Sequence, residues 1–385
     1  MSTGDAGSPP APAEGGQPLL EAEHVKLHFP IKQGLLIDRT VGVVHAVDDV
    51  SLTLQEGQTL GVVGESGCGK STLARCIVRL LEPTSGAVRF RGRDVTHLNR
   101  RGLMPLRREV QLVFQDPVAS LNPRKRVGQI IGTPLRLHGM ERDQVQNRVR
   151  ELLDRVGLNS EHVNRFPHEF SGGQRQRIGV ARALAMEPRL IVLDEPVSAL
   201  DVSVQAQVVN LLDDLQDDFG LSYVFIAHDL SVVRHVSDQI AVMYLGKIME
   251  LSPAQELYSK PIHPYTEALL AAIPIPDPRE NRARERTVIG GEPPNPINPP
   301  SGCRFHTRCP RATDICSTVE PPLAEYPGGH LAACHHPLNV SSAEVARATR
   351  SLLSPVSAGA EMPSGEAGPP GAGSSAEVSN APGDR

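Results

Sequence analysis

A glycine-rich stretch at residues 64–72 constrains this chain more than any other sequence feature. It reads GESGCGKST and fits the pattern G-x-x-x-x-G-K-[ST] at every fixed position. An apolar, strand-like run precedes it and a helical pattern follows it, which is the order that phosphate binding requires. The glycines let successive backbone N–H groups point at an anion, and the helix N-terminus adds a positive field. We therefore expect a nucleotide site in which Lys70 contacts the β- and γ-phosphates and Ser71 ligates Mg²⁺.

Size and charge narrow the class of protein. The 385 residues allow one large α/β domain and a small second one. A formal net charge of -5 argues against nucleic acid as the main partner. No apolar run approaches membrane-spanning length, and the N-terminus lacks the pattern of a signal peptide. We therefore expect a soluble, cytoplasmic chain that reaches a membrane only through another protein.

Composition divides the chain into five parts. Both ends are rich in small and polar residues, which have little to bury, so we expect them to be disordered. Within the α/β domain, strand patterns give way to helical periodicity at about 116–180, which predicts an inserted helical subdomain. Residues 31–44 are interpreted as a loop or insertion. In chain order, the parts are a disordered tail (1–18), an α/β domain (19–275), a Pro-rich linker (276–300), a Cys-rich extension (301–340) and a second disordered tail (341–385).

Polar residues follow several predicted strands, at the edge where α/β folds place ligands. The buried apolar run 190–193 ends in Asp194 and Glu195. Two acids at a strand tip fit a site for Mg²⁺ and a reactive water. Gln115 and His228 each end another predicted strand, so we expect these four side chains to share one edge of the sheet.

Two further features have more than one interpretation. Ser171 can cap a helix, and the two glycines after it open the backbone to an approaching phosphate. Taken alone, the same stretch is an ordinary loop and cap. Phe29 ends the first predicted strand, where its ring could stack on a purine or pack in the core or at a sheet edge.

The order and spacing of these elements resemble the ATP-binding subunits of ABC transporters. The resemblance covers about residues 19–274 and includes the phosphate loop, the acidic pair, His228, the Ser-Gly-Gly-Gln signature at 171–174 and Asp201. Phe170 departs from the family's commonest signature, which has Leu there, but leaves the phosphate-facing residues intact. The resemblance implies an α/β P-loop ATPase core with an inserted helical subdomain and a small Cys-rich C-terminal extension.

The resemblance also implies a role for each site residue. Glu195 would polarise the attacking water, and His228 would contact the γ-phosphate. Asp201 would signal across a head-to-tail dimer in which the signature of each chain faces the partner's ATP. The expected ATP contacts are Phe29, Gly64, Glu65, Ser66, Gly67, Cys68, Gly69, Lys70, Ser71, Thr72 and Gln115. The expected Mg²⁺ ligands are Ser71, Gln115 and Asp194, and the signature residues are Ser171, Gly172, Gly173 and Gln174.

Finer features look like the oligopeptide/dipeptide importer branch of that family. They are the stretches FQDPVASLNPR at 114–124, HPYTEALL at 263–270 and GCRFHTRCP at 302–310. The branch implies an ATPase that energises uptake of oligopeptides or dipeptides. Nickel, a glycoside or another cargo stays open, as does, with less support, a non-transport ABC ATPase.

The same resemblance implies the partners of the chain. They are a second ATP-binding subunit, homologous or identical to this one, two transmembrane permease subunits and, through these, an extracellular substrate-binding protein. These partners place the chain at the cytoplasmic side of the cell membrane. Residues 117–127 are expected to line a groove that receives a short helix of the membrane subunit. A solvated basic loop is the alternative for this segment.

Four cysteines in the C-terminal extension follow the spacing C-x5-C-x6-C-x17-C, in a segment too small to build its own core. Four thiolates could hold Zn²⁺ or an iron–sulfur cluster, and nearby histidines keep zinc open. Four reduced, buried cysteines are the third possibility. The resemblance favours a [4Fe–4S] cluster with a structural or redox-sensing role. The cysteines are Cys303, Cys309, Cys316 and Cys334, and the histidines are His306, His330, His335 and His336.

Overall fold

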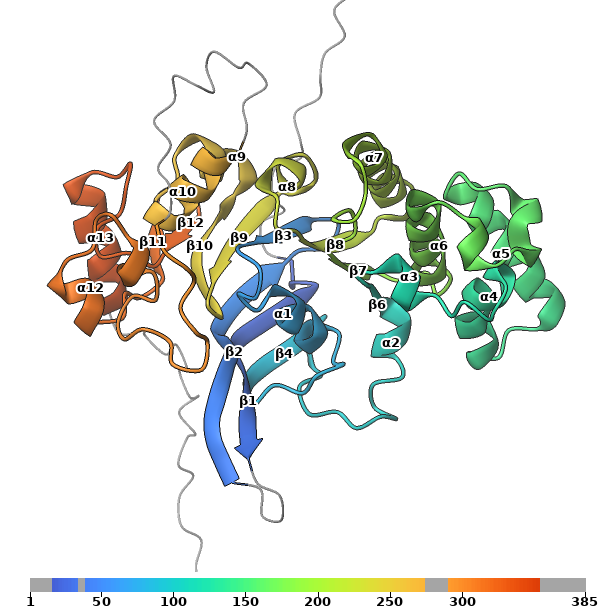
Figure 1. Ribbon diagram of the computed structural model, residues 1–385, viewed down its shortest axis with the longest axis horizontal. Helices are drawn as coiled ribbons and strands as arrows, with labels where there is room; N and C mark the ends of the chain where they lie inside the picture. The colour runs from blue at the N-terminus through green and yellow to red at the C-terminus, as the bar shows by residue number, and fades with distance from the viewer. Residues whose placement is uncertain (1–15, 34–38, 274–289, 354–385) are drawn as a thin grey trace, which may run out of the picture.

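The computed structural model describes residues 16–33, 39–273 and 290–353 (Figure 1). Its main sheet has eight strands in the order β11-β12-β10-β9-β3-β8-β7-β6. The pairs among β9, β3, β8, β7 and β6 are parallel, whereas β10, β12 and β11 join by antiparallel pairing. The strands span Thr59–Val63 (β3), Val110–Val113 (β6), Leu190–Asp194 (β7), Ser222–Ile226 (β8), Gln239–Tyr244 (β9), Lys247–Pro253 (β10), Ala324–Tyr326 (β11) and His330–Ala332 (β12).

The central strands are apolar because both faces of the parallel sheet are covered. Every residue of β3, β7 and β8 is buried, which explains their nearly continuous apolar sequences. Helix α1 (Lys70–Ile77) contacts β8 and β7 on one side and β1 and β2 on the other. It therefore lies between the main sheet and a second sheet (Figure 1).

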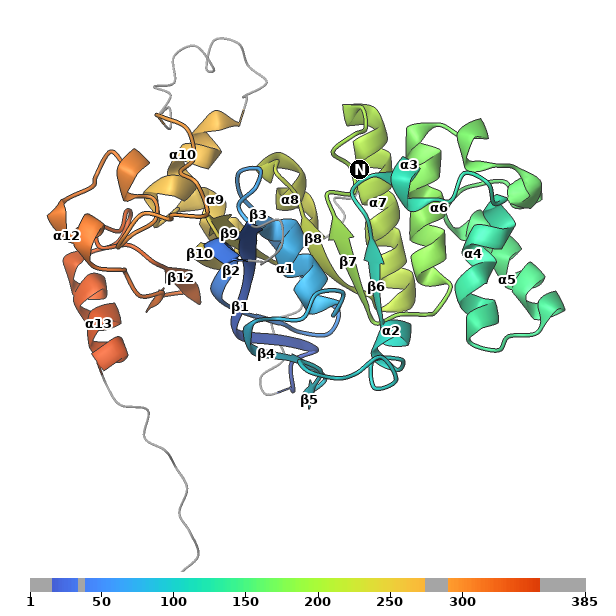
Figure 2. The same cartoon turned by 60° about the horizontal axis from the view of Figure 1, so that its bottom comes forward.

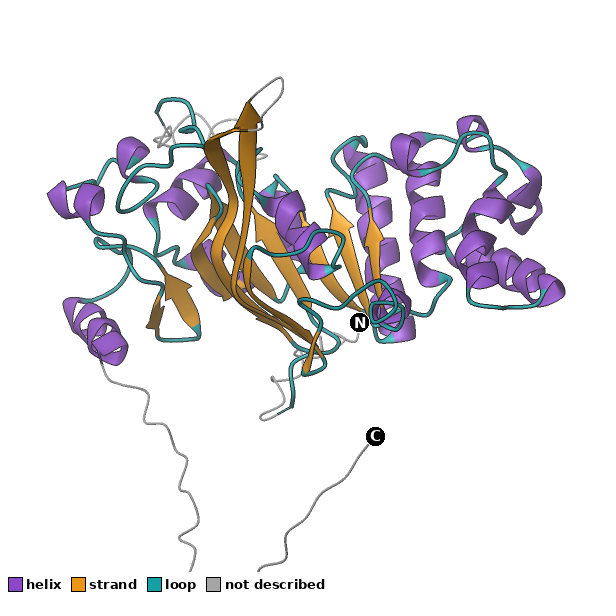
Figure 3. Cartoon of the chain, turned by 90° about the horizontal axis from the view of Figure 1, so that it is seen from below, coloured by secondary structure: helices purple, strands orange, loops and turns teal. Residues whose placement is uncertain are grey.

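The strands of the second sheet pair antiparallel in the order β2-β1-β4-β5. All strands are orange in Figure 3. Its strands span Leu20–Gln33 (β1), Arg39–Leu54 (β2), Ser85–Phe90 (β4) and Arg93–Asp94 (β5). The interpretation of residues 31–44 as a loop was wrong for most of this segment, because β1 and β2 continue through it as a hairpin and Ile31 pairs with Gly42. Backbone pairing between two neighbouring strands extends the hairpin, and the β-branched residues Thr40, Val41, Val43 and Val44 suit it. Residues 34–38, at its tip, lie outside the described residues.

Between β6 and β7 the described chain is helical. The elements are α3 (Pro117–Ser120), α4 (Val127–Leu137), α5 (Arg142–Arg155), η1 (Ser160–Asn164), η2 (Pro167–Glu169) and α6 (Gly172–Leu184). Helix α5 buries Val145, Val149 and Leu152, one face at helical spacing, against α4 and α6. Figure 2 shows these helices at one end of the molecule, opposite the C-terminal elements.

The remaining helices follow the strands in chain order. They are α2 (Leu106–Glu109), α7 (Val202–Phe219), α8 (Leu230–Val236), α9 (Ala254–Ser259) and α10 (Pro264–Ala272). The C-terminal elements are η3 (His306–Arg308), α12 (Asp314–Thr318), β11, β12 and α13 (Ser342–Leu353). Because β12 pairs with β10, the extension continues the main sheet instead of forming a separate body.

The expected disorder from residue 341 onward was wrong for α13. This helix contacts β11, and its Ala348 is 3% exposed. Its start is stabilised by reciprocal hydrogen bonds, from Ser341 N to Glu344 Oε2 (2.7 Å) and from Glu344 N to Ser341 Oγ (3.3 Å). A small apolar face and a capping box are thus enough to order a segment whose composition suggests a tail.

Other parts of that division fall partly outside the described residues. These are 1–15 of the first tail, 34–38 and 274–275 of the α/β domain, 276–289 of the linker and 354–385 of the second tail. Residues 290–300 of the linker are described and contain neither helix nor strand.

Candidate nucleotide-binding site

The glycine-rich loop connects β3 to α1 and requires glycine at two close approaches. A Cβ atom on Gly64 would lie 2.1 Å from the carbonyl oxygen of Met243, and one on Gly69 would lie 2.0 Å from that of Ala46. Both glycines have positive φ, +150° and +107° respectively. The loop therefore wraps tightly under the backbone of β9 and β2, and larger residues could not adopt this path.

Lys70 and Ser71 are the first two residues of α1 and directly follow the glycine turn. Lys70 Nζ donates to the carbonyl oxygens of Gly64 (2.8 Å) and Glu65 (3.0 Å), which holds the ammonium group inside the loop. Ser71 Oγ donates a 2.7 Å hydrogen bond to Asp194 Oδ1. A hydroxyl and a carboxylate from two different elements therefore meet where the sequence predicts Mg²⁺.

This oxygen pair fits a magnesium ion. Burial raises the pKa of Asp194, and the hydrogen bond from Ser71 opposes that shift. A divalent cation would favour the charged carboxylate, and oxygen atoms are the ligands that Mg²⁺ prefers. Ser71 and Asp194 could hold the ion together with waters and phosphate oxygens.

Three side chains converge beside that pair. Gln115 Nε2 donates to Glu195 Oε2 at 2.7 Å, and His228 Nδ1 lies 3.7 Å from the same oxygen. These residues follow β6, β7 and β8, which are adjacent in the sheet, so their carboxyl ends meet at one edge. Glu195 has a φ of +46°, and its N–H donates to Ile226 O at 3.0 Å. A strained backbone that fixes a carboxylate in this way is characteristic of functional sites.

An open cavity joins the loop to this edge. Phe29 is 39% exposed and lines the cavity, a position that favours ring stacking over core packing. Pro296, from the expected linker, also lines it, and its carbonyl oxygen accepts from His45 N at 3.2 Å. Sequence reasoning missed Pro296, since one proline in a proline-rich run carries no distinguishing signal. The lining residues are Phe29, Val44, Ala46, Ser66, Gly67, Gly69, Lys70, Ser71, Thr72, Gln115, Glu195 and Pro296.

Three expected ATP contacts belong to the loop but do not line the cavity: Gly64, Glu65 and Cys68. Cys68 is buried, which raises the pKa of its thiol. The Glu65 carboxylate turns away from the cavity towards Arg308 of the C-terminal extension. That contact was also missed, because nothing local links residues so far apart in the sequence.

The signature residues lie outside the cavity that Lys70 lines. Ser171 caps α6, accepting from Gln174 N at 3.3 Å, while its own N–H donates to Gln174 Oε1 at 3.0 Å. A Cβ on Gly173 would lie 2.4 Å from Val204 Cγ1, so this glycine allows α6 to approach α7 closely. Ser171, Gly172 and Gln174 are exposed, as is Asp201 at the start of α7. Within one chain, the structure does not bring these residues to the phosphate loop.

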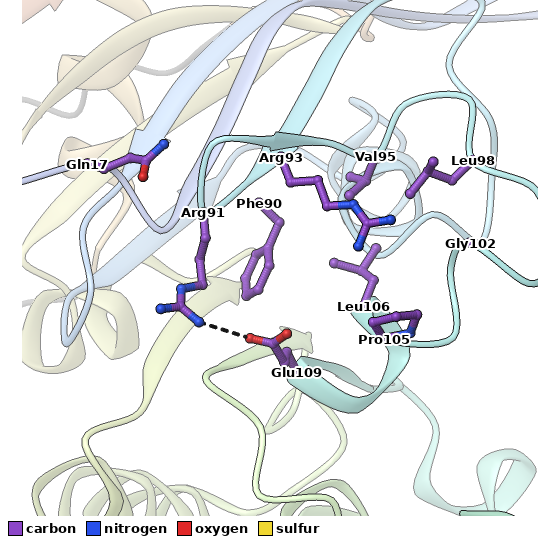
Figure 4. Close-up of a pocket in the computed structure, with 10 residues that line it drawn as sticks. All are labelled: Gln17, Phe90, Arg91, Arg93, Val95, Leu98, Gly102, Pro105, Leu106 and Glu109. Carbon is purple, nitrogen blue, oxygen red and sulfur yellow. Dashed lines mark ion pairs between the residues drawn. The ribbon is translucent and has the colours of Figure 1, made fainter.

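A second cavity lies between β4, β5 and α2 (Figure 4). Phe90, Val95 and Leu106 contribute apolar lining, and the ion pair between Arg91 and Glu109 (3.5 Å) borders it. It shares no lining residue with the nucleotide cavity.

The four C-terminal cysteines are buried or half-buried. Burial raises the pKa of Cys303 to about 11 and that of Cys334 to about 12, and the neighbouring cysteines contribute to both shifts. Cys303 N donates to Cys316 O at 2.8 Å, so these two residues are neighbours. The nearby histidines each have one ring nitrogen engaged elsewhere: His306 with Cys303 O, His330 with Glu250, His335 with Val319 O and His336 with Thr313.

These cysteines do not form a tetrahedral set for a single zinc ion. Thiolates around one Zn²⁺ would be about 3.8 Å apart, given Zn–S bonds of about 2.3 Å. Among the described residues, the three potential metal ligands whose ligand atoms all lie within 4.8 Å of one another are His28, His45 and Asp48. Arg304 already forms an ion pair with Asp48, which disfavours a second cation there.

None of the helices in the described ranges combines the length and apolar character needed to cross a membrane.

Comparison with known proteins identifies two matching families. Residues 47–198 match the ABC transporter family, and residues 249–316 match the oligopeptide/dipeptide transporter C-terminal region. The oligopeptide transport ATP-binding protein AppF of Bacillus subtilis (strain 168) is 54% identical over 325 residues, 84% of this chain and 98% of that protein. The dipeptide transport ATP-binding protein DppF of Escherichia coli (strain K12) is 48% identical over 319 residues, 83% of this chain and 94% of that protein.

Solved structures show the same likeness. The ATP-binding cassette MJ0796, in a dimeric post-hydrolysis state bound to ADP and Pi, is 28% identical, with a TM-score of 0.55 over 61% of this chain and 98% of that one. The protein cbiO1 of Clostridium perfringens, part of the ABC transporter complex cbiONQ, is 27% identical, with a TM-score of 0.55 over 63% of this chain and 92% of that one.

Proposed function

The chain belongs to the ABC transporter ATP-binding family, in the branch with the oligopeptide/dipeptide transporter C-terminal region, and we propose that it hydrolyses ATP to energise peptide import. The observation that carries the ATPase assignment is the convergence of Ser71, Asp194 and Glu195 at one edge of the sheet. Peptide cargo is supported by relatives that are named for oligopeptide or dipeptide transport.

Each residue at this edge has a distinct task in the proposed reaction. Lys70 and the loop N–H groups bind the phosphates, and Phe29 stacks on the base. Glu195 accepts a hydrogen bond from, and so polarises, the attacking water, Gln115 fixes the carboxylate, and His228 contacts the γ-phosphate. When bound to Ser71 and Asp194, Mg²⁺ would neutralise charge on the β- and γ-phosphates.

A head-to-tail pair of ATP-binding subunits would complete the site. The exposed signature at the start of α6 is absent from the cavity of its own chain, yet the N-terminus of a capped helix is suited to bind phosphate. A partner's signature could cover the phosphates bound by Lys70. ATP would then join two surfaces, and its hydrolysis would release them.

The membrane partners belong to the same proposal. Two permease subunits, served by an extracellular binding protein, would hold this chain peripherally at the cytoplasmic side of the cell membrane. The segment 117–127 is proposed to contact a short helix of a permease. Leu121 does not take part directly, because it is 1% exposed and packs in the core, whereas residues 122–126 are exposed.

We also propose that the four C-terminal cysteines hold a [4Fe–4S] cluster. A multi-iron cluster keeps its thiolates farther apart than one zinc ion does, so it does not require three thiols within 4.8 Å of one another. Burial on the extension would shield such a cluster from solvent. Its role is structural or redox-sensing, since ATP hydrolysis makes no use of it.

Transport in proteoliposomes tests the proposed function. The chain would be reconstituted with its partner ATPase, both permeases and the binding protein, and uptake of a labelled dipeptide and a labelled tetrapeptide would be followed. We expect uptake of at least one peptide with Mg-ATP, and none with the variant Glu195→Gln. ATP-dependent uptake of nickel or a glycoside, with no uptake of peptide, would overturn the cargo assignment and leave the ATPase assignment intact.

A further inference from the structure

The C-terminal extension contacts the glycine-rich loop through one arginine, Arg308. Arg308 Nη1 donates to Glu65 Oε2 at 2.7 Å, and Nη2 donates to Glu65 Oε1 at 3.0 Å. The two residues, 243 positions apart in the sequence, therefore form a bidentate ion pair. The Arg308 side chain is 7% exposed and that of Glu65 is 23% exposed. A pair with this geometry and burial is stronger and more directional than an ion pair at the surface.

Further contacts hold Arg308 in place. Its Nη1 also donates to Tyr244 Oη (3.3 Å), and its Nε donates to Gly290 O (3.1 Å). Phe305, from the same turn, packs against Tyr244 and Tyr265 with ring centroids 5.4 Å and 5.2 Å away. The guanidinium group is therefore a fixed support and not a mobile surface charge.

Glu65 is held at its backbone as well as at its carboxylate. Its N–H donates to Tyr265 Oη (3.0 Å), and its carbonyl oxygen accepts from Lys70 Nζ (3.0 Å). The next residue, Ser66, lines the nucleotide cavity. Any shift of Glu65 therefore moves both the phosphate-binding lysine and a wall of the cavity.

We propose that Arg308 is a positioning residue for nucleotide binding, which makes the C-terminal extension part of the nucleotide site. The proposal rests on the ATP-binding part of the proposed function and is independent of the cargo. A preorganised loop binds its ligand more tightly, because less ordering remains to be done on binding. Loss of the Arg308–Glu65 pair would loosen the loop and weaken ATP binding, while leaving the residues that act on the water in place.

Binding of the fluorescent nucleotide TNP-ATP to the full chain, with Mg²⁺ present, tests this proposal. We expect Arg308→Ala and Glu65→Gln each to raise the Kd about tenfold, as small misplacements of a site can do. Arg308→Lys keeps the charge but loses the bidentate geometry, so its Kd should lie between those of wild type and Arg308→Ala. The double variant should be no worse than either single variant, because both remove one interaction.

A matched control separates positioning from attachment of the extension. Glu320 forms an ion pair with Lys247 of β10, so Glu320→Gln also removes a contact between the extension and the sheet, away from the loop. Its Kd should equal that of wild type. If Arg308→Ala prevents folding, Glu65→Gln still tests the pair, since it changes one atom of the loop residue. Unchanged Kd values in both variants, or an equal loss in Glu320→Gln, would overturn the proposal.

Kinetics of the assembled transporter supply a second readout. The KM for ATP should rise in Glu65→Gln, with kcat at saturating ATP close to the wild-type value. A fall in kcat at unchanged KM would show that the pair acts on the chemical step and would contradict a positioning role in binding.

Discussion

Gln115 Nε2 donates a 2.7 Å hydrogen bond to Glu195 Oε2, and this contact links the carboxyl ends of two neighbouring strands, β6 and β7. It fixes the direction of the carboxylate proposed to polarise water. The same oxygen lies 3.7 Å from His228 Nδ1, at the end of β8. Two side chains that are far apart in the sequence, Gln115 and His228, therefore lie beside one oxygen atom of Glu195.

Phe29 is expected to bind the base of ATP. Phe29→Ala should weaken ATP binding by about 1–3 kcal/mol, the range found for stacking of a base on an aromatic ring. Binding of inorganic tripolyphosphate, which has no base, should not change. Val41→Ala removes another exposed apolar side chain of the same hairpin and serves as the control. Equal losses for ATP and tripolyphosphate would show that Phe29 acts on the loop and does not stack.

Mixing two inactive variants tests whether each ATP site is shared between chains. Lys70→Ala removes the proposed phosphate contact, and Ser171→Arg blocks the proposed signature with a bulky charge. In a head-to-tail pair of the two variants, one site combines an intact loop with an intact signature. ATPase activity should therefore return towards half of the wild-type value in each mixed pair, and towards about a quarter in an equimolar mixture in which half of the pairs are mixed. If cross-linking shows that mixed pairs form and activity stays at the level of the single variants, the shared site is wrong.

The cysteine proposal predicts a coloured protein. Chain purified without oxygen should be brown and contain about four iron and four sulfide per chain, as a [4Fe–4S] cluster requires. Cys309→Ser should lose both, whereas Cys76→Ser, at a buried cysteine of α1 outside this set, should keep them. Zinc in a colourless protein, or no metal, would contradict the cluster without affecting the ATPase assignment.

The elements that surround the proposed nucleotide site follow from local patterns in the sequence. The loop, the helix after it and the acids at the end of β7 are each specified by a few adjacent residues, and parallel strands then bring their ends together. The resemblance to ABC ATP-binding subunits was confirmed by the comparisons. Phe29 was left between two interpretations, because its exposure depends on the strand that faces it.

The errors and omissions have a common cause, which is contact between distant segments. Pairing of Glu65 with Arg308 and of β12 with β10 depends on how the extension folds back onto the core. Helix α13 becomes ordered through its contact with β11, although its composition resembles a tail. Composition and periodicity describe a segment by itself and contain no information about such partners.

His263 should make the stability of the chain depend on pH. Complete burial lowers the pKa of His263 from 6.5 to about 4, although Glu250 nearby opposes the shift. Between these values the unfolded chain binds more protons than the folded one, so stability falls as the pH drops from 7. At pH 5 this group alone should cost about 2 kcal/mol.

His263→Asn provides the comparison for that effect. His263 Nδ1 accepts from Tyr265 N (3.0 Å) at the start of α10, and asparagine can cap a helix in the same way without titrating. Urea unfolding near pH 7 and near pH 5 should show a smaller pH-dependent loss in the variant. Identical losses in the two proteins would mean that His263 does not titrate as its burial requires.

Hydrolysis of ATP by Glu195→Gln in the assembled transporter tests the central claim most directly. Glutamine keeps the shape of the side chain but cannot act as a base, so turnover should fall about a hundredfold or more while TNP-ATP binding stays unchanged. Glu187→Gln, at an exposed glutamate that also has positive φ, should hydrolyse ATP at the wild-type rate. Wild-type turnover in Glu195→Gln would contradict the assignment of Glu195 as the residue that polarises the attacking water.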